Sequence, residues 1–271
     1  FIPDFEKPSD GNSQNTYEVS IAAADENGTS YQNFTIQITD ENESPFFESN
    51  ASFQAFENQL VVGTPVTDDL DEYFTHTYSI EPQPSYLDDA VLFDINSSSG
   101  QITFKSAPDF EANGSVEGNN IYKLTIRATD QGNVFADQNI TVTVLDDNDR
   151  PSLFDGNIND SLISIGEDTM VGTLLADFNV SDQDASQTHL WELNGSDAAF
   201  FELDSSTGEL KLKVSLDREN PSDADSDNIY DLTLTAMDSH TSPMTSDPFD
   251  FQVTVSNVNE PPYLSGTFDV S

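Results

Sequence analysis

Cysteine is absent from the 271 residues, which excludes disulfides, thiolate metal sites and a cysteine nucleophile. Basic residues are scarce as well: 8 Lys and Arg stand against 50 Asp and Glu, for a formal net charge of −42. A chain this acidic repels nucleic-acid backbones and anionic membrane surfaces, and it attracts cations. We therefore expect no nucleic-acid partner.

Long apolar runs are also lacking, because none approaches the roughly 20 residues that a membrane-spanning helix needs. The N-terminal Phe1-Ile2-Pro3-Asp4 has no basic region of the kind that opens a signal peptide. We expect a segment of a longer, soluble protein that does not itself insert into a membrane. Hydrophobic residues make up only 35% of the chain, a composition that would also fit a disordered acidic chain.

Internal repeats argue against disorder. The motifs Asp4-Phe5-Glu6, Asp109-Phe110-Glu111 and Asp217-Arg218-Glu219 begin 105 (109 − 4) and 108 (217 − 109) residues apart. A Tyr follows each first Asp after 13 residues, and an Ala-x-Asp motif ends 21 residues after it; these are Tyr17, Tyr122 and Tyr230, and Asp25, Asp130 and Asp238. The period is that of a whole domain and not of a short solenoid unit.

Each copy closes with an acidic linker that ends in proline, over residues 40–45, 146–151 and 257–262. We therefore divide the chain into four parts. Residues 1–45 are the C-terminal half of a repeat with its linker, 46–150 and 151–260 are complete repeats, and 261–271 begin a following repeat.

Between these landmarks, apolar side chains alternate with polar ones, as half-buried strands require. The pattern is seen in Tyr122, Leu124, Ile126 and Ala128, and again in Tyr230, Leu232, Leu234 and Ala236. Several short strands with Gly, Asn and Asp turns over about 100 residues predict an all-β sandwich. The prediction is a tandem array of such domains, with the single Trp191 in a core or on a sheet face.

The order of the motifs resembles the cadherin superfamily: an early Glu, then Asp-x-Asp, Asp-Arg-Glu, Ala-x-Asp and a closing Asp-x-Asn-Asp-x-Pro. The resemblance covers essentially the whole chain. It implies seven-stranded Greek-key, immunoglobulin-like sandwiches with calcium bound where successive domains meet. The extreme acidity also suggests a saline habitat, such as that of a marine bacterium, and hence a bacterial cadherin-like protein.

Physical chemistry supports calcium independently of the resemblance. Ca²⁺ is a hard cation that prefers carboxylate, amide and backbone oxygens. Zinc would favour His or Cys, and we expect that His76, His189 and His240 share no repeat position. Several carboxylates also repel one another strongly when they are brought together, so that they need a counter-ion.

The resemblance implies metal ligands at two junctions. The junction between the complete repeats, for which three ions are expected, uses Glu57, Asp109, Glu111, Asp146, Asp147 through its carbonyl, Asn148, Asp149, Asp182, Asp184 and Asp238. The earlier junction uses Asp4, Glu6, Asp40, Glu41, Asn42, Glu43, Asp69, Asp71 and Asp130. A last junction, with Glu167, Asp217, Glu219, Asn259 and Glu260, has Asn257 in the place of the linker Asp and is expected to be weak or empty.

The leading hypothesis is an extracellular, calcium-rigidified adhesion segment or adhesin stalk from a membrane-anchored cell-surface protein. Its partner would be another adhesion protein, homophilic or heterophilic, or a surface glycan. The alternative is a calcium-dependent carbohydrate-binding module, which would need an exposed row of aromatic side chains. No nucleophile elbow, Gly-rich phosphate loop or His-based metal motif occurs, so we predict no enzyme. Asp223-Ala224-Asp225-Ser226-Asp227 is interpreted as an acidic surface turn, because Gly and Glu of an EF-hand loop are missing.

Overall fold

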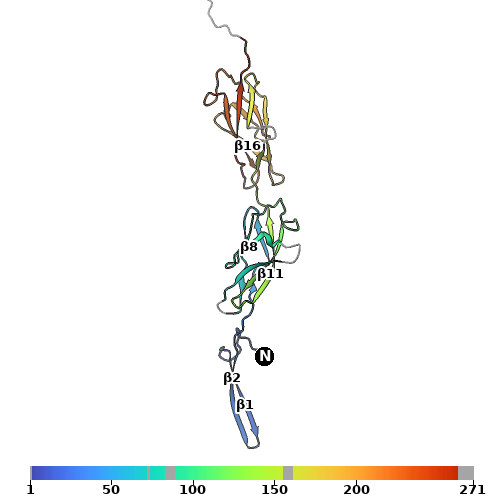
Figure 1. The fold of residues 1–271 in the computed structure, drawn as a ribbon, viewed down its shortest axis with the longest axis vertical. Coiled ribbons are helices and arrows are strands. Elements are labelled where there is room, and N and C mark those ends of the chain that lie inside the picture. Colours follow the sequence, from blue (N-terminus) through green and yellow to red (C-terminus); the bar gives the residue numbers. More distant parts are fainter. Residues whose placement is uncertain (1, 72–73, 83–88, 155–160, 262–271) are drawn as a thin grey trace, which may run out of the picture. The chain divides into compact units, whose positions relative to one another are not determined.

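The computed structural model describes residues 2–71, 74–82, 89–154 and 161–261. The chain divides into two compact units, Phe1–Asp147 and Asn148–Ser271, and each is built from β-strands (Figure 1). The only helical elements in the described parts are two short 3-10 turns, η1 (Ala90–Leu92) and η2 (Ala198–Phe200). Accordingly, no helix there has the length and apolar character needed to cross a membrane.

The first unit contains a four-stranded sheet and a three-stranded sheet. The first runs in the order β4 (Ser52–Phe56), β11 (Phe135–Leu145), β10 (Ile121–Thr129) and β7 (Thr77–Glu81), and the second in the order β5 (Val61–Gly63), β9 (Ile102–Phe104) and β8 (Phe93–Ile95). A small pair, β3 (Phe46–Phe47) and β6 (Thr67–Asp68), completes them. Strand β4 runs parallel to β11, whereas β10 is antiparallel to both of its neighbours.

The core of this unit is supplied by the alternating residues of these strands. Tyr122, Leu124 and Ile126 of β10 are at most 3% exposed, and Phe93 and Phe104 pack against Tyr122 from the other sheet. Burying such side chains stabilises the fold by about 1.5–3 kcal/mol each. The predicted all-β sandwich is confirmed here.

The second unit repeats the arrangement. Its sheets have the orders β13 (Leu162–Gly166), β20 (Phe249–Ser256), β19 (Ile229–Asp238), β16 (His189–Asn194), and β14 (Leu174–Asp177), β18 (Glu209–Leu212), β17 (Phe201–Leu203). A third, two-stranded sheet joins β12 (Ser152–Phe154) to β15 (Asn179–Ser181). Tyr230 and Leu234 are fully buried, and Trp191 is 6% exposed in the same core, so the prediction that Trp191 is a packing residue is confirmed.

The N-terminal part of the first unit is a long antiparallel hairpin of β1 (Thr16–Asp25) and β2 (Gly28–Gln37), which form a sheet of their own (Figure 1). Its alternating apolar residues are exposed: Ile21 by 56% and Ile36 by 50%. The alternation therefore predicts the strands correctly, but it does not by itself bury them. The division at residues 45, 150 and 260 remains a prediction, and residues 262–271 of the expected following repeat lie outside the described residues.

Candidate metal centres

Four carboxylates come together near the linker that follows β2. Glu6, Asp40, Glu43 and Asp71 each offer an oxygen, and these oxygens lie within 4.8 Å of one another; we call this set the Glu43 cluster. The backbone N–H of Glu43 donates to Asp71 Oδ2 over 3.1 Å. The cluster thus joins the linker to the loop that follows β6.

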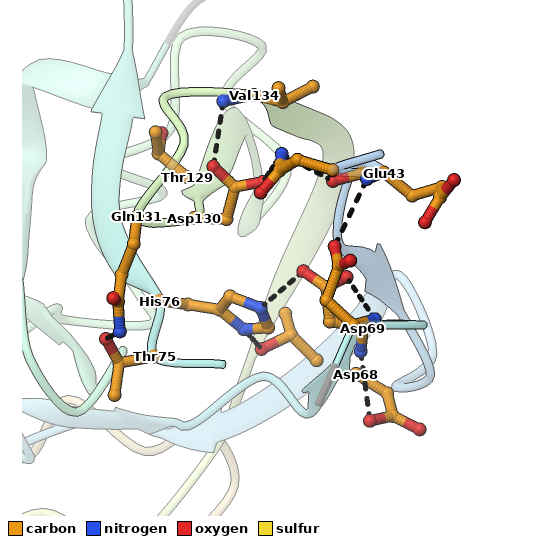
Figure 2. Close-up of polar contacts among 12 residues, drawn as sticks. Glu43, Asp68, Asp69, Thr75, His76, Thr129, Asp130, Gln131 and Val134 are labelled. Carbon is orange, nitrogen blue, oxygen red and sulfur yellow. Dashed lines mark hydrogen bonds and ion pairs between the residues drawn. The ribbon is translucent and has the colours of Figure 1, made fainter. Parts of the chain in front are cut away.

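The remaining predicted ligands of this junction differ in their surroundings. Asn42 Nδ2 donates to Asp130 Oδ2 over 2.7 Å, and the N–H of Val134 holds the other oxygen of Asp130 (Figure 2). Asp69 accepts the N–H of Asp71 at Oδ1. Asp4 accepts the N–H of Lys7 and lies near enough for its charge to raise the pKa of Glu43, although it is not one of the four carboxylates of the cluster. Glu41 is exposed and is not one of them either.

Histidine belongs to this region, which corrects our expectation that the His residues share no repeat position. His76 Nε2 lies 3.2 Å from Asp69 Oδ2, and Figure 2 shows the ring directed at that carboxylate. His189 Nε2 lies 2.7 Å from Asp182 Oδ2 in the second unit. In both repeats the His follows the Asp by seven residues. The expectation was wrong because it concerned His as a metal ligand, whereas each of these rings is the partner of a predicted ligand.

A second cluster lies within the first unit, beside the end of β11. Glu57, Asp109 and Glu111 bring one oxygen each within 4.8 Å of the others; this is the Glu57 cluster. Glu57 is fully buried, and its two oxygens accept the N–H groups of Asp147 (3.0 Å) and Phe110 (2.7 Å). Asp109 accepts the N–H of Ala112, and Asp146 is exposed.

The second unit holds the other predicted ligands in a matching arrangement. Asn148 Nδ2 donates to Asp238 Oδ2 over 2.9 Å, just as Asn42 does to Asp130. The N–H of Asp149 donates to Asp184 Oδ2 over 2.7 Å, as that of Glu43 does to Asp71. Asp184 in turn donates its N–H to Asp182 Oδ1. Within this unit the structure therefore groups Asn148, Asp149, Asp182, Asp184 and Asp238.

Two further acidic groups occur in the second unit. Glu167, Asp217 and Glu219 form the Glu167 cluster, at the positions equivalent to the Glu57 cluster. Asp223, Asp225 and Asp227 also lie close together, but Asp223 accepts the N–H groups of Asp227 and Asn228. These bonds close a turn, as our interpretation of that segment requires.

One asparagine in each repeat was missed by the sequence reasoning. Asn15, Asn120 and Asn228 have positive φ angles of 59°, 57° and 65° respectively. Each donates its side-chain amide to the carbonyl in the middle of the Asp-x-Glu motif, over 2.8, 2.6 and 3.1 Å respectively. The constant offset of 11 residues from the first Asp could have revealed them.

A buried carboxylate was missed as well. Asp89 and Asp197 are 1% and 2% exposed. Asp89 accepts the N–H groups of Val116 and Lys123, and Asp197 accepts the equivalent ones of Ala224 and Asp231, all within 2.8 Å. A buried carboxylate held in this way joins the segments that supply the N–H groups, and neither Asp89 nor Asp197 belongs to an acidic cluster of the described residues.

The pKa shifts in the Glu43 cluster differ in direction from the shift of Asp130 beside it. Burial raises the pKa of Glu43, and the charges of Glu6, Asp71 and Asp40 raise it further. Burial also raises the pKa of Asp71, with a contribution from Asp69. For Asp130, burial acts in the same direction, but hydrogen bonds from Asn42 and from Val134 N–H outweigh it and leave the pKa lowered. The Glu43 cluster thus carries unrelieved repulsion that a cation would relieve.

The donor set of the Glu43 cluster suits Ca²⁺, because it offers only hard oxygen ligands. One observation points the same way: Glu43 Oε2 is buried, and within the described residues it has no hydrogen-bond partner. A buried carboxylate oxygen without a donor is unfavourable unless a charge of opposite sign compensates it. His76 faces Asp69 and not this oxygen.

The family model described as Cadherin domain matches residues 161–256. Rat cadherin-23 is 34% identical over 234 residues, which are 81% of this chain, and human cadherin-23 is 31% identical over 96% of it. The chain belongs to the cadherin superfamily.

A solved structure of PcdhgB3 EC1-4 has the same cadherin fold, with a TM-score of 0.53 and 21% identity over 93% of this chain and 60% of that one. Human protocadherin gamma-A4 is 31% identical over 65% of this chain. The cadherin segment described here spans only 7% of the rat and 8% of the human cadherin-23 sequence, and 17% of protocadherin gamma-A4.

Proposed function

We propose that this cadherin segment binds Ca²⁺ at its acidic clusters and that the bound metal rigidifies the tandem repeats for adhesion. The observation that carries the proposal is the Glu43 cluster, in which Glu6, Asp40, Glu43 and Asp71 approach within 4.8 Å. Like charges at that separation repel one another and favour binding of a divalent cation.

At the first junction, Glu6, Asp40, Glu43 and Asp71 would hold the metal directly, together with Asp69. Asn42 keeps Asp130 oriented through its amide. Bound calcium supplies the positive charge that offsets the repulsion between these carboxylates. The linker residues Asp40 and Glu43 are then fixed to the loop that carries Asp71. In the absence of metal, repulsion would loosen this connection.

For the second junction, the proposal rests on separate support from each unit. The first unit presents the Glu57 cluster, followed by Asp146 in the sequence. The second unit presents Asp182, Asp184 and Asp238, held by hydrogen bonds within that unit. Each group is anionic and made of oxygen donors, as calcium requires.

We further propose an extracellular location at a cell surface, with another adhesion protein as the partner. The support is the cadherin-23 and protocadherin relatives and the acidity, which suits calcium-rich surroundings. The affinity expected of extracellular calcium modules is about 10⁻⁴–10⁻³ M. The saline and bacterial origin that the composition suggests stays a prediction.

A carbohydrate-binding role has less support. It needs several aromatic rings on one exposed face, whereas Phe93, Phe104, Phe201 and Phe251 lie in the two cores. The exposed rings of Tyr31 and Phe34 lie on opposite faces of β2, since their positions differ by an odd number of residues. We also propose no catalytic role, since the carboxylates of the clusters recur with the linkers and not in one enclosed cleft. A glycan array with and without calcium would separate the carbohydrate hypothesis from adhesion.

The proposal is tested by calorimetric titration of the 271-residue chain with Ca²⁺ and by melting in EGTA and in millimolar Ca²⁺. We expect several bound ions and a large rise in melting temperature. Asp146→Ala/Asp182→Ala should reduce both. The matched control Glu192→Ala/Glu202→Ala removes the same charge from exposed strand positions and should bind calcium like the wild type. No heat of binding and no shift in melting would overturn the proposal.

A further inference from the structure

The first Asp of each Asp-x-Asp pair has the same histidine partner in both complete repeats. The pairs are Asp69–His76 and Asp182–His189, at 3.2 and 2.7 Å. The two Asp residues are 113 positions apart (182 − 69), and so are the two His residues (189 − 76). The pairing is therefore a repeated feature of the fold and not a chance surface contact.

Both oxygens of these carboxylates are held. Oδ1 of Asp69 accepts the N–H of Asp71 over 3.2 Å, and Oδ1 of Asp182 accepts that of Asp184 over 3.1 Å. Oδ2 faces the imidazole in each case. A carboxylate oxygen has two lone pairs, so that each keeps one free for a cation. The two donors fix the plane of the carboxylate before any metal arrives.

The imidazoles are themselves fixed by burial. The side chains of His76 and Asp69 are 3% and 1% exposed, and those of His189 and Asp182 are 13% and 5% exposed. His189 begins β16 and lies opposite Asp238 in the β16–β19 register. The strand therefore places the ring beside two predicted ligands, of which it contacts Asp182.

Behind His76 stands a chain of hydroxyl groups that the second repeat lacks. Thr67 Oγ lies 2.8 Å from His76 Nδ1 and 2.6 Å from the Tyr78 hydroxyl. A neutral ring with its proton on Nε2 would donate to Asp69 and accept from Thr67. The positions 113 residues later are Val180 and Trp191, which have no hydroxyl. Phe74 also stacks on His76, with ring centroids 4.9 Å apart.

We propose that His76 and His189 are positioning residues that hold Asp69 and Asp182 in the orientation for binding Ca²⁺; this inference rests on the proposed calcium function. Neither ring is itself a ligand. Hydrogen-bond partners of metal ligands typically change metal affinity by about 10–100-fold when they are removed. The contact with Thr67 gives the His76 ring a second anchor, which the residues at the equivalent positions cannot give to His189.

The test compares His76→Leu and His76→Gln in the full chain, and His189→Leu and His189→Gln likewise, at pH 7.5. Calorimetry should show a loss of calcium affinity of about 10–100-fold for the Leu variants. The Gln variants, whose Nε2 can still donate, should stay within a few-fold of the wild type. Melting in EGTA separates this effect from an effect on the fold.

Three outcomes would decide against the inference in distinguishable ways. A wild type that binds no Ca²⁺ overturns the proposed function and this inference together. Leu variants that bind like the wild type overturn the positioning role alone, and so do Gln variants that are as weak as the Leu variants. If His76→Leu fails to melt cooperatively, the matched variants His189→Leu and His189→Gln decide the positioning role by the same criteria.

Discussion

The Glu57 and Glu167 clusters occupy equivalent positions in the two complete repeats and share one design. In both, a buried glutamate accepts two backbone N–H groups: Glu57 from Asp147 and Phe110, and Glu167 from Val258 and Arg218. These bonds are the first cause of the lowered pKa of Glu167. The backbone N–H groups therefore favour the ionised form of Glu167.

The clusters differ in the linker residue that follows. The first linker has Asp146, whereas the second has Asn257, whose Nδ2 donates to Glu219 Oε1 over 2.6 Å. Its amide brings no charge and occupies a carboxylate oxygen. The hydrogen bond with Glu167 and burial raise the pKa of Glu219, although Asn257 lowers it in part. One amide thus lowers both the negative charge of the cluster and the number of its free carboxylate oxygens. The Glu57 cluster is therefore expected to bind calcium more tightly than the Glu167 cluster.

The largest effect on the melting temperature and on its rise with calcium should come from Glu57→Ala. The change leaves the N–H groups of Asp147 and Phe110 without their acceptor, at about 1–3 kcal/mol for each that stays buried, and it removes a proposed ligand. We expect lower melting temperatures in EGTA and a smaller rise with calcium. Asp89→Ala is the comparison, since it also orphans two N–H groups but should leave the calcium-induced rise intact. Equal rises in both variants would show that Glu57 is only structural.

The next largest effect, on calcium affinity, should come from exchanging the linker residues Asp146 and Asn257. Asp146→Asn makes the first cluster resemble the second, and we expect about tenfold weaker binding of at least one ion, since calcium affinity follows ligand charge. Asn257→Asp should do the reverse for the Glu167 cluster, because it removes the donor to Glu219 and adds a carboxylate. Calorimetry on both variants measures the exchange. Unchanged affinities would mean that the amide does not explain the difference.

A smaller effect is expected at Asn120. Its amide donates to the Phe110 carbonyl, and its φ is 57°, so Asn120→Ala loses a hydrogen bond worth about 0.5–1.5 kcal/mol and strains the backbone. Asn120→Gly keeps the backbone conformation and loses only the bond. We expect the order wild type, Gly, Ala in urea-unfolding stability. A Gly variant less stable than the Ala variant would contradict the role of the left-handed conformation.

The sequence predicts those parts of the fold and site that leave a regular spacing of residue types along the chain. Alternation along residues 121–129 and 229–238 predicts strands, and the offset of 21 residues finds Asp130 and Asp238, which the structure pairs with Asn42 and Asn148. The parallel pairing of β4 with β11 has no such signal, because alternation gives the face of a strand and not its neighbour.

The partners of the candidate ligands were harder to predict, for a physical reason. Asp89 reaches N–H groups 27 and 34 residues away, and any residue supplies an N–H, so no residue type marks the contact. His76 and His189 do share an offset from an Asp-x-Asp motif. Of the four residues that separate the motif from the His, only Thr75 and Thr188 match, so that the sequence marks this shared offset weakly.

The smallest effect should come from a charge pair remote from the clusters. Two hydrogen bonds from Arg127, at 2.7 and 2.8 Å, lower the pKa of Asp137. A carboxyl group whose pKa is lowered by folding adds stability above its unfolded value, near 3.9, and loses it as the pH falls through the folded value. Arg127→Met should therefore lower the melting temperature slightly, and by more at pH 7 than at pH 2, in EGTA and calcium alike. Because exposed pairs contribute little, a calcium-dependent difference in this variant would mean that charge anywhere on the chain, and not the clusters, governs the response to metal.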